Sequence, residues 1–257
     1  MDFDYIVADP TGNITVLILS PYSEDSRQAM IRESFSKEPS CEQVGFLMPV
    51  DEESVRLEMM GYEFCGNATL SAAAWHAGMH GLEPGQSSDV TVYSSGADIP
   101  LRVHVHSLQE SEYEGTVRMP MPSVSSHRGY PLVQFDGISH LIVPSHDFTD
   151  EEAERSVREF AYELDVPAMG LMLCPDYNNL ISCGMDICPV SIRPLVYVPG
   201  SDTVFWEHGC ATGSTAIGWY RCHISGSTHT EIQQPGGTIC VDIQDGQPVM
   251  TGKVTFR

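Results

Sequence analysis

A short cysteine motif occurs twice in this chain, once in each half of the sequence. The first copy is residues 63–69 (EFCGNAT) and the second is residues 207–214 (EHGCATGS). In both copies a run of small residues follows the cysteine and leads to a tryptophan. Small residues let another backbone or a ligand approach closely. The repeat therefore predicts two similar halves, each with a closely packed helix that begins at a cysteine, Cys65 or Cys210.

The start of a helix is an unusual chemical position for a thiol. Backbone N–H groups are free there, and the helix end has a partial positive charge. A cysteine at such a place is expected to have a lowered pKa, from about 8.5 to roughly 3.5–7.5. An arbitrary cysteine is more often a small buried apolar residue, but matching positions in both halves favour a functional pair. The motif thus predicts two acid–base groups that face each other.

Turn residues divide the remaining sequence into many strands and a few helices. Helices are expected over 23–36, with Ser23 as N-cap, and over 150–164, and the two cysteine helices are expected to reach Gly78 and about Cys222. The predicted strands, in a largely antiparallel set, are 2–8, 13–19, 43–50, 54–60, 88–94, 99–107, 113–119, 130–135, 139–143, 168–174, 192–198, 203–206, 228–233, 238–243 and 249–256.

A division into two domains follows from a proline- and serine-rich stretch. Residues 120–126 (PMPSVSS) are expected to form a linker. The first domain would span residues 1–120 and the second residues 121–247. The two cysteines are further apart than half the chain length, so residues 248–257 are expected to return to the first domain as a last strand.

Composition excludes several classes of partner. The 257 residues include 13 basic and 35 acidic side chains, a formal net charge of −22. Nucleic acid and anionic membrane surfaces would repel such a chain. No secretory signal or stretch of 18 apolar residues is visible, so a cytoplasmic location is expected, with the eight cysteines as free thiols.

The same sequence argues against cofactors. Pyridoxal phosphate requires a Schiff-base lysine, and neither of the two lysines, Lys37 and Lys253, lies in such a motif. No P-loop or dinucleotide fingerprint occurs. Cys183, Cys188 and the Cys222–His223 pair lack the spacing of a zinc site. Neither a cofactor nor a metal is therefore expected.

The motif segments are similar to those of the diaminopimelate epimerase and proline racemase superfamily, which contains cofactor-independent amino-acid racemases with two catalytic cysteines. Within it, the closest likeness is to the histidine racemases of staphylopine-type metallophore pathways. The resemblance extends in order over nearly the whole chain. It rests on residues 9–13 (DPTGN), 41–46 (CEQVGF), 61–69 (GYEFCGNAT), 193–199 (RPLVYVP) and 234–237 (QPGG).

The resemblance implies an α+β fold of two pseudo-symmetric domains, each a mainly antiparallel β-barrel around a central helix, with the site between them. It implies that Cys65 and Cys210 exchange protons with a free amino acid, most simply histidine. Substrate choice must then come from side-chain contacts, and Glu42 is a candidate partner for the imidazole. A homodimer is left open. The expected substrate-binding residues, in side chain or backbone, are Asn13, Glu42, Gln43, Gly66, Asn67, Ala68, His140, Glu207, Ala211, Thr212 and Gly213.

Several alternatives stay open at this point. Turn or edge positions would explain Asn13, Glu42 and Gln43 equally well, and a lone strand histidine such as His140 is usually structural. Residues 211–214 also resemble phenazine-pathway isomerases, which use a glutamate near the position of Glu42. The substrate could be another free amino acid, although the distal Glu–Arg pair of diaminopimelate epimerases is not evident. A thiol redox protein or a non-catalytic amino-acid-binding protein would be of a different class.

Overall fold

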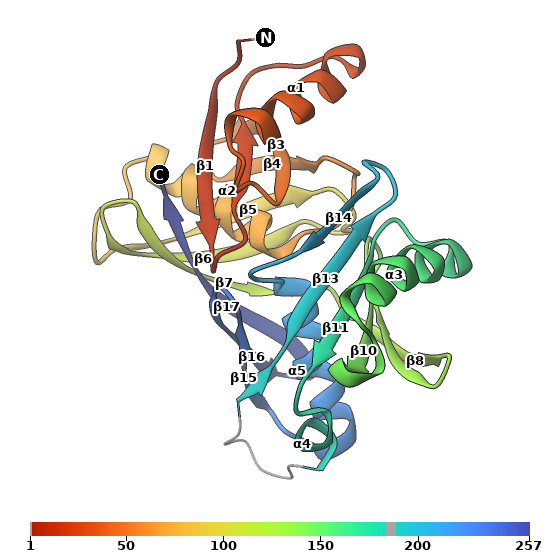
Figure 1. Cartoon of the computed structure of the whole chain (residues 1–257). Coiled ribbons are helices and arrows are strands. Elements are labelled where there is room, and N and C mark those ends of the chain that lie inside the picture. Colours follow the sequence, from red (N-terminus) through yellow and green to blue (C-terminus); the bar gives the residue numbers. More distant parts are fainter. Residues whose placement is uncertain (1, 183–188) are drawn as a thin grey trace.

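The computed structural model describes residues 2–182 and 189–257. The N-terminal half of the chain and the last strand together form a closed barrel of eight strands. Their order is β1 to β7 and then β17, which pairs back to β1 (Figure 1). The strands of this barrel are β1 (Tyr5–Pro10), β2 (Thr15–Ile18), β3 (Gln43–Asp51), β4 (Ser54–Met59), β5 (Ser87–Ser94), β6 (Leu101–Gln109), β7 (Glu112–Arg118) and β17 (Gln247–Phe256).

Helix α2 (Gly66–Met79) runs through the middle of this barrel. It packs against β1, β3 to β7 and β17, and nearly all of its residues are buried. A helix surrounded by strands has no solvent face, and small side chains let the strands approach it closely. The alanine run 72–74 meets this requirement, with 0–1% exposure. Outside the barrel, α1 (Glu24–Lys37) begins with a capping box formed by Ser23 and Ser26.

The C-terminal half contains a six-stranded sheet in the order β14-β13-β11-β10-β9-β8. Helix α3 (Asp150–Leu164) packs on β11 and β13, and α5 (Ala211–Ser225) packs between this sheet and strands β15 to β17. The remaining elements are β8 (Ser123–His127), β9 (Tyr130–Gln134), β10 (Ser139–Pro144), β11 (Met169–Cys174), β12 (Val190–Ser191), β13 (Arg193–Val198), β14 (Thr203–Trp206), β15 (His229–Gln234), β16 (Gly237–Gln244), the short 3₁₀ helix Ser145–Asp147 and α4 (Tyr177–Ser182).

Strand pairing follows the same order in both halves. The pairs β1–β2, β2–β3 and β3–β4 are antiparallel, parallel and antiparallel. The pairs β9–β10, β10–β11 and β11–β13 repeat that series. Strand β17 joins the halves, because it pairs with β16 of the second half and with β7 and β1 of the first. In Figure 1 it runs in dark blue from the lower half to the barrel.

One predicted segment differs from the structure. Of the expected linker 120–126, residues 123–126 belong to β8, which pairs antiparallel with β9. Backbone pairing along the sheet edge satisfies the N–H and C=O groups of this serine-rich strand, and outweighs the local preference of serine for irregular structure. The chain therefore passes between its halves in only a few residues.

Glycines allow the two halves to touch backbone to backbone at three places. A Cβ added to Gly12 would lie 2.5 Å from the Cα of Gly236, and one added to Gly137 would lie 2.7 Å from the Cα of Gly96. A Cβ on Gly200 would lie 3.1 Å from the Cα of Gly61. Real Cβ atoms rarely approach other atoms so closely, so any larger residue would push the halves apart. We call these pairs the glycine contacts.

Within the described ranges, no helix is both long and apolar enough to cross a membrane. The six cysteines of those ranges are free thiols. Cys183 and Cys188, considered above as metal ligands, lie outside the described residues.

Candidate active site

The two motif cysteines occupy equivalent positions in the fold. Each is the N-cap of its helix, Cys65 of α2 and Cys210 of α5, with an extended backbone conformation. The two helices begin directly against each other, because a Cβ added to Gly66 would lie 2.9 Å from the Cβ of Ala211. Two helix N-termini, with their N–H groups and partial positive charge, thus meet between the halves.

A cavity lies at this meeting point, and both cysteines line it. Nine sequence-predicted residues and seven others surround it. The predicted ones are Asn13, Glu42, Gln43, Cys65, Asn67, Glu207, Cys210, Ala211 and Thr212. The residues that the sequence argument missed are Met60, Glu63, Phe64, Ile138, Val196, Val198 and Phe205.

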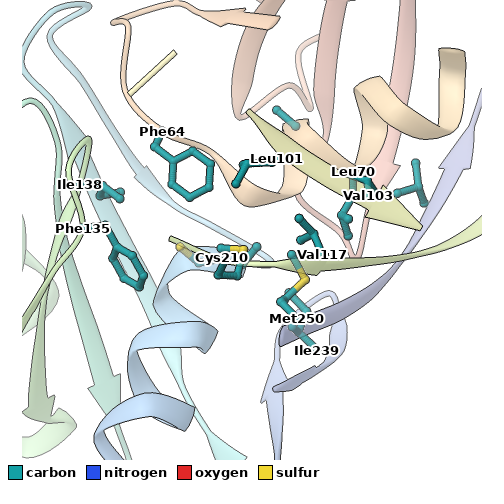
Figure 2. Packing of buried hydrophobic residues seen from close by; sticks show 14 of the residues in the cluster. Phe64, Leu70, Leu101, Val103, Val117, Phe135, Ile138, Cys210, Ile239 and Met250 are labelled. Carbon is teal, nitrogen blue, oxygen red and sulfur yellow. The ribbon is translucent and has the colours of Figure 1, made fainter. Parts of the chain in front are cut away.

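Cys210 is more deeply buried than Cys65. It has 4% exposure, whereas Cys65 is half-buried. In Figure 2 Cys210 lies at the beginning of α5, among buried side chains that include Phe135 and Ile138 on one side and Val117 on the other. Its sulfur is therefore enclosed by apolar groups except where polar residues of the cavity reach it.

Polar partners hold both sulfur atoms. The Cys65 thiol donates a hydrogen bond to Oε1 of Gln43 at 3.1 Å, and the backbone N–H of Ala68 donates to its sulfur at 3.4 Å. Cys210 Sγ lies 3.6 Å from Oγ1 of Thr212, and the neighbouring carboxyl group of Glu207 interacts with the thiol. Each thiol is thus oriented by at least one side chain.

The prediction that the position at a helix start lowers the pKa of both thiols is wrong. Burial raises the pKa of Cys65 to about 12, and the negative charge of Glu207 adds to this effect. Burial and Glu207 also raise the pKa of Cys210 well above its ordinary value. The helix amides act in the opposite direction, but the loss of hydration outweighs them. Both groups are therefore protonated thiols at neutral pH.

An amide network connects the two halves beside the cysteines. Asn13 accepts hydrogen bonds at Oδ1 from Gln43 (2.6 Å) and Asn67 (3.0 Å). Asn67 also donates to the carbonyl oxygen of Gly209 at 2.8 Å, which lies in the other half, next to Cys210. The network therefore holds two groups in fixed relative positions: the side chain of Gln43, which contacts Cys65, and the backbone just before Cys210.

Glu42 belongs to the same network. Its carboxylate accepts a hydrogen bond from Nδ2 of Asn13 at 2.6 Å and one from the backbone N–H of His208 at 3.2 Å. The imidazole ring of His208 also contacts it. The carboxylate thus joins the first half to the segment that leads to Cys210.

Four predicted residues lie behind the cavity wall. His140 is completely buried, and its Nε2 lies 2.9 Å from Oγ1 of Thr212, so it reaches the site only through that hydroxyl. Burial lowers the pKa of His140 to about 3, so its ring is neutral. Gly66 and Ala68 belong to the first turn of α2 and Gly213 to that of α5.

Two carboxyl groups of the cavity have raised pKa values. Burial raises the pKa of Glu207 to about 8, and the charge of Glu42 contributes. Burial raises the pKa of Glu63 to about 7. Among the residues that the structure describes, no group of three histidine, cysteine or acidic side chains could hold a metal ion.

Gln234 also contacts the site, and its role was not predicted. Its Oε1 accepts a hydrogen bond from the backbone N–H of Cys210 at 2.6 Å, and its Nε2 donates to Ser214 at 2.9 Å. The segment 234–237 contributed to the family resemblance, but nothing in its composition indicated that a side chain from β15 fixes the start of α5.

Comparisons with known proteins give a consistent result. The sequence model of the histidine racemase CntK N-terminal domain matches residues 2–252. The chain is 28% identical to a histidine racemase of Fusobacterium nucleatum, over 98% of this chain and 93% of that protein. It is 26% identical to a histidine racemase of Staphylococcus aureus, over 91% and 85% of the two chains.

Solved structures share the fold. A predicted epimerase from Pseudomonas aeruginosa has a TM-score of 0.71 at 15% identity, with 100% of this chain and 97% of that one covered. A phenazine biosynthesis protein of the PhzF family from Bacillus anthracis has a TM-score of 0.63 at 13% identity, with the same coverage. At these identities the likeness concerns the fold alone.

Proposed function

The chain belongs to the histidine racemase family described by the CntK N-terminal domain, and we propose that it interconverts L- and D-histidine with Cys65 and Cys210 as opposing acid and base. It is an isomerase whose substrate is a free amino acid. The observation that supports the cysteine pair most strongly is their placement: two thiols, each at a helix start, line one cavity from opposite halves.

The reaction exchanges two protons. A thiolate on one face of the substrate removes the proton from Cα and becomes a thiol. The thiol on the other face gives its proton to Cα and becomes the thiolate. The number of protons in the site is unchanged, and the configuration at Cα is inverted. Either cysteine can act first, depending on the hand of the histidine that binds.

The carbanion that forms between these steps needs stabilisation. Its charge spreads onto the α-carboxylate, which we place against the first turns of α2 and α5. The dipole of one helix end contributes only about 0.3–2 kcal/mol, whereas one preorganised hydrogen-bond donor to an oxyanion contributes roughly 2.7–4 kcal/mol. The backbone amides of Gly66, Asn67, Ala211 and Thr212 are therefore more important than the dipoles.

Substrate binding supplies the charge that turns a thiol into a thiolate. The protein groups around the two thiols keep them protonated, partly because Glu207 is close to each. The α-ammonium group of histidine has the opposite charge, so its arrival near Glu207 favours the ionised forms of the neighbouring acids. Ionisation is thus tied to occupancy.

Supporting residues keep the two sulfur atoms in position. Gln43 accepts the hydrogen bond of the Cys65 thiol. Thr212 lies between Cys210 and the neutral ring of His140. We assign Gln43 and Thr212 a positioning role. We assign Asn13 and Asn67 to the amide network that holds the halves together.

We infer that the halves are two pseudo-symmetric domains, 1–120 with 248–257, and 121–247. Three findings support this division: the repeated series of strand pairings, the equivalent cysteine N-caps, and the pairing of β17 with β7 and β1. A site between two such domains places one cysteine on each side of the substrate.

Incubation of the purified chain with L-histidine in deuterated buffer tests the proposal. We expect deuterium at Cα together with D-histidine, and we expect Cys65→Ser and Cys210→Ser each to abolish both. Cys240→Ser is the matched control, because Cys240 lies on β16 and does not line the cavity. Full activity of either motif variant would rule out the two-base mechanism.

A further inference from the structure

Three glutamates line the cavity, and two of them are engaged by polar groups of the site. Glu42 accepts hydrogen bonds from Asn13 and His208. Glu207 lies next to Cys210 and Asn13, and both act on its pKa. These contacts assign one carboxylate to the frame between the halves and the other to a catalytic thiol.

Glu63 is held in a different way. It has 4% exposure, and its Oε2 accepts a hydrogen bond from the backbone N–H of Gly61 at 2.8 Å. Its own backbone N–H also interacts with the carboxyl group. Both donors belong to the turn that precedes Cys65, so they fix the carboxyl group in place without engaging the catalytic groups. A buried carboxylate is costly unless it is paired, which makes this group suited to a hydrogen-bond donor on a ligand.

The turn itself is held from behind. Arg27 of α1, with 2% exposure, donates hydrogen bonds to the carbonyl oxygens of Met59 (2.5 Å) and Met60 (2.8 Å). A Cβ on Gly61 would lie 2.3 Å from Cγ1 of Val198, so the turn is also pressed against the second half. The position of the Glu63 carboxyl group is therefore set before any ligand binds.

Apolar side chains make up much of the remaining cavity wall. Met60 comes from the same turn, Val196 and Val198 from β13, and Phe205 from β14. An imidazole ring has flat faces that suit apolar contacts and N–H groups at its edge. A fixed carboxyl acceptor combined with an apolar wall is complementary to such a ring.

We propose that the Glu63 carboxyl group hydrogen-bonds the imidazole ring of the substrate and makes the site selective for histidine. This inference rests on the proposed racemase function and assigns its specificity. With the α-carboxylate at the helix starts, the side chain of the same substrate molecule extends into the rest of the cavity, which Glu63 lines together with Cys65.

The acidity of the two groups also fits. The pKa of Glu63 is raised to about 7, and a free imidazole has a pKa of about 6.5. One proton can therefore reside on either partner while the hydrogen bond is kept. The charge of Glu63 also raises the pKa of Cys65 and of Glu207, which indicates that the three groups face one confined space.

The experiment compares histidine with β-(2-thienyl)-L-alanine, whose ring has a similar size but no N–H. In deuterated buffer, proton NMR gives KM for histidine exchange at Cα and the inhibition constant of thienylalanine as a competitor. We expect thienylalanine to bind about 10- to 150-fold more weakly than histidine, as for loss of a charged hydrogen bond. The measured quantity is the ratio of the inhibition constant of thienylalanine to KM for histidine. In Glu63→Met, which removes the acceptor, this ratio should approach one, and in Glu63→Gln it should be intermediate. Glu53→Gln, a change in the exposed turn between β3 and β4, is the matched control.

Each outcome has one meaning. A ratio that stays high in Glu63→Met, with histidine still exchanging, overturns the specificity role and leaves the racemase function intact. A ratio near one in the unaltered protein overturns it as well, and needs no variant to fold. If the unaltered protein exchanges no α-hydrogen of histidine, the racemase function itself fails.

Discussion

Gly66 and Ala211 stand against each other at the starts of the two central helices, with 2.9 Å between a Cβ built on the glycine and the Cβ of the alanine. This contact sets how closely the two N-termini, and therefore the two cysteines, approach each other. It involves two backbone-attached positions, so a clash there cannot be relieved by rotating a flexible side chain.

A methyl group at this contact should separate the cysteines. We expect Gly66→Ala to reduce kcat for histidine by at least about tenfold, since small misplacements of reacting groups cost up to about a hundredfold in rate. Steady-state polarimetry measures the effect. Gly218→Ala is the control, because its Cβ would meet Val241 at 2.6 Å, away from the cavity. If the two variants lose kcat equally, the contact does not set the cysteine geometry.

The raised pKa of Glu207 predicts how stability changes with pH. The folded protein keeps this group protonated up to about pH 8, whereas an unfolded chain ionises it near about pH 4.3. Between these values the folded state binds more protons, so the free energy of unfolding falls as pH rises, by roughly 1.4 kcal/mol per pH unit. Urea unfolding from pH 5 to 8 should show a shallower decline for Glu207→Gln. Parallel curves would contradict the assignment.

Removal of the Thr212 hydroxyl should affect both stability and turnover. The hydroxyl lies 2.9 Å from Nε2 of His140 and 3.6 Å from the sulfur of Cys210. Thr212→Val leaves the buried ring nitrogen without this partner, which should cost about 1–3 kcal/mol of unfolding free energy. The same change should lower kcat by a larger factor than it changes KM. Thr212→Ser keeps the hydroxyl and should stay close to the unaltered protein. Equal behaviour of the two variants would rule out the positioning role.

Glu42 is expected to influence all substrates alike. Its carboxylate binds Asn13 and His208, so we propose that it joins the halves and does not select the imidazole ring as the sequence suggested. Glu42→Ala should lower kcat/KM for histidine and for a slowly exchanging neutral amino acid by the same factor. A loss confined to histidine would restore the sequence-based interpretation.

Local sequence rules predict much of the secondary structure. The helix predicted over 150–164 is confirmed as α3. It could be predicted because local residues mark both of its ends: a capping box of Thr149 and Glu152 begins it, and Asp165 in a left-handed conformation ends it. The cysteine helices were found from the repeated motif, which combines an N-cap position with small residues. Signals of this kind lie within a few residues of the feature they predict.

Other features depend on distant parts of the chain and could not be predicted. The pKa of a thiol at a helix start is set by how much hydration the complete fold removes, and no local pattern contains that information. The cavity wall joins Met60 and Glu63 with Val196 and Phe205, which are brought together only by the tertiary packing. Residues 123–126 form a strand because β9 is beside them, although their own sequence favours a linker.

The glycine contacts limit how this sequence can vary. At each of them both partners already have the smallest side chain, as with Gly12 and Gly236. A larger residue on one side cannot be offset by a smaller one on the other, so compensation would require a whole half of the molecule to shift. No single substitution at these positions is therefore compatible with the fold. A saturation mutagenesis screen should find them as intolerant of substitution as the cysteines themselves.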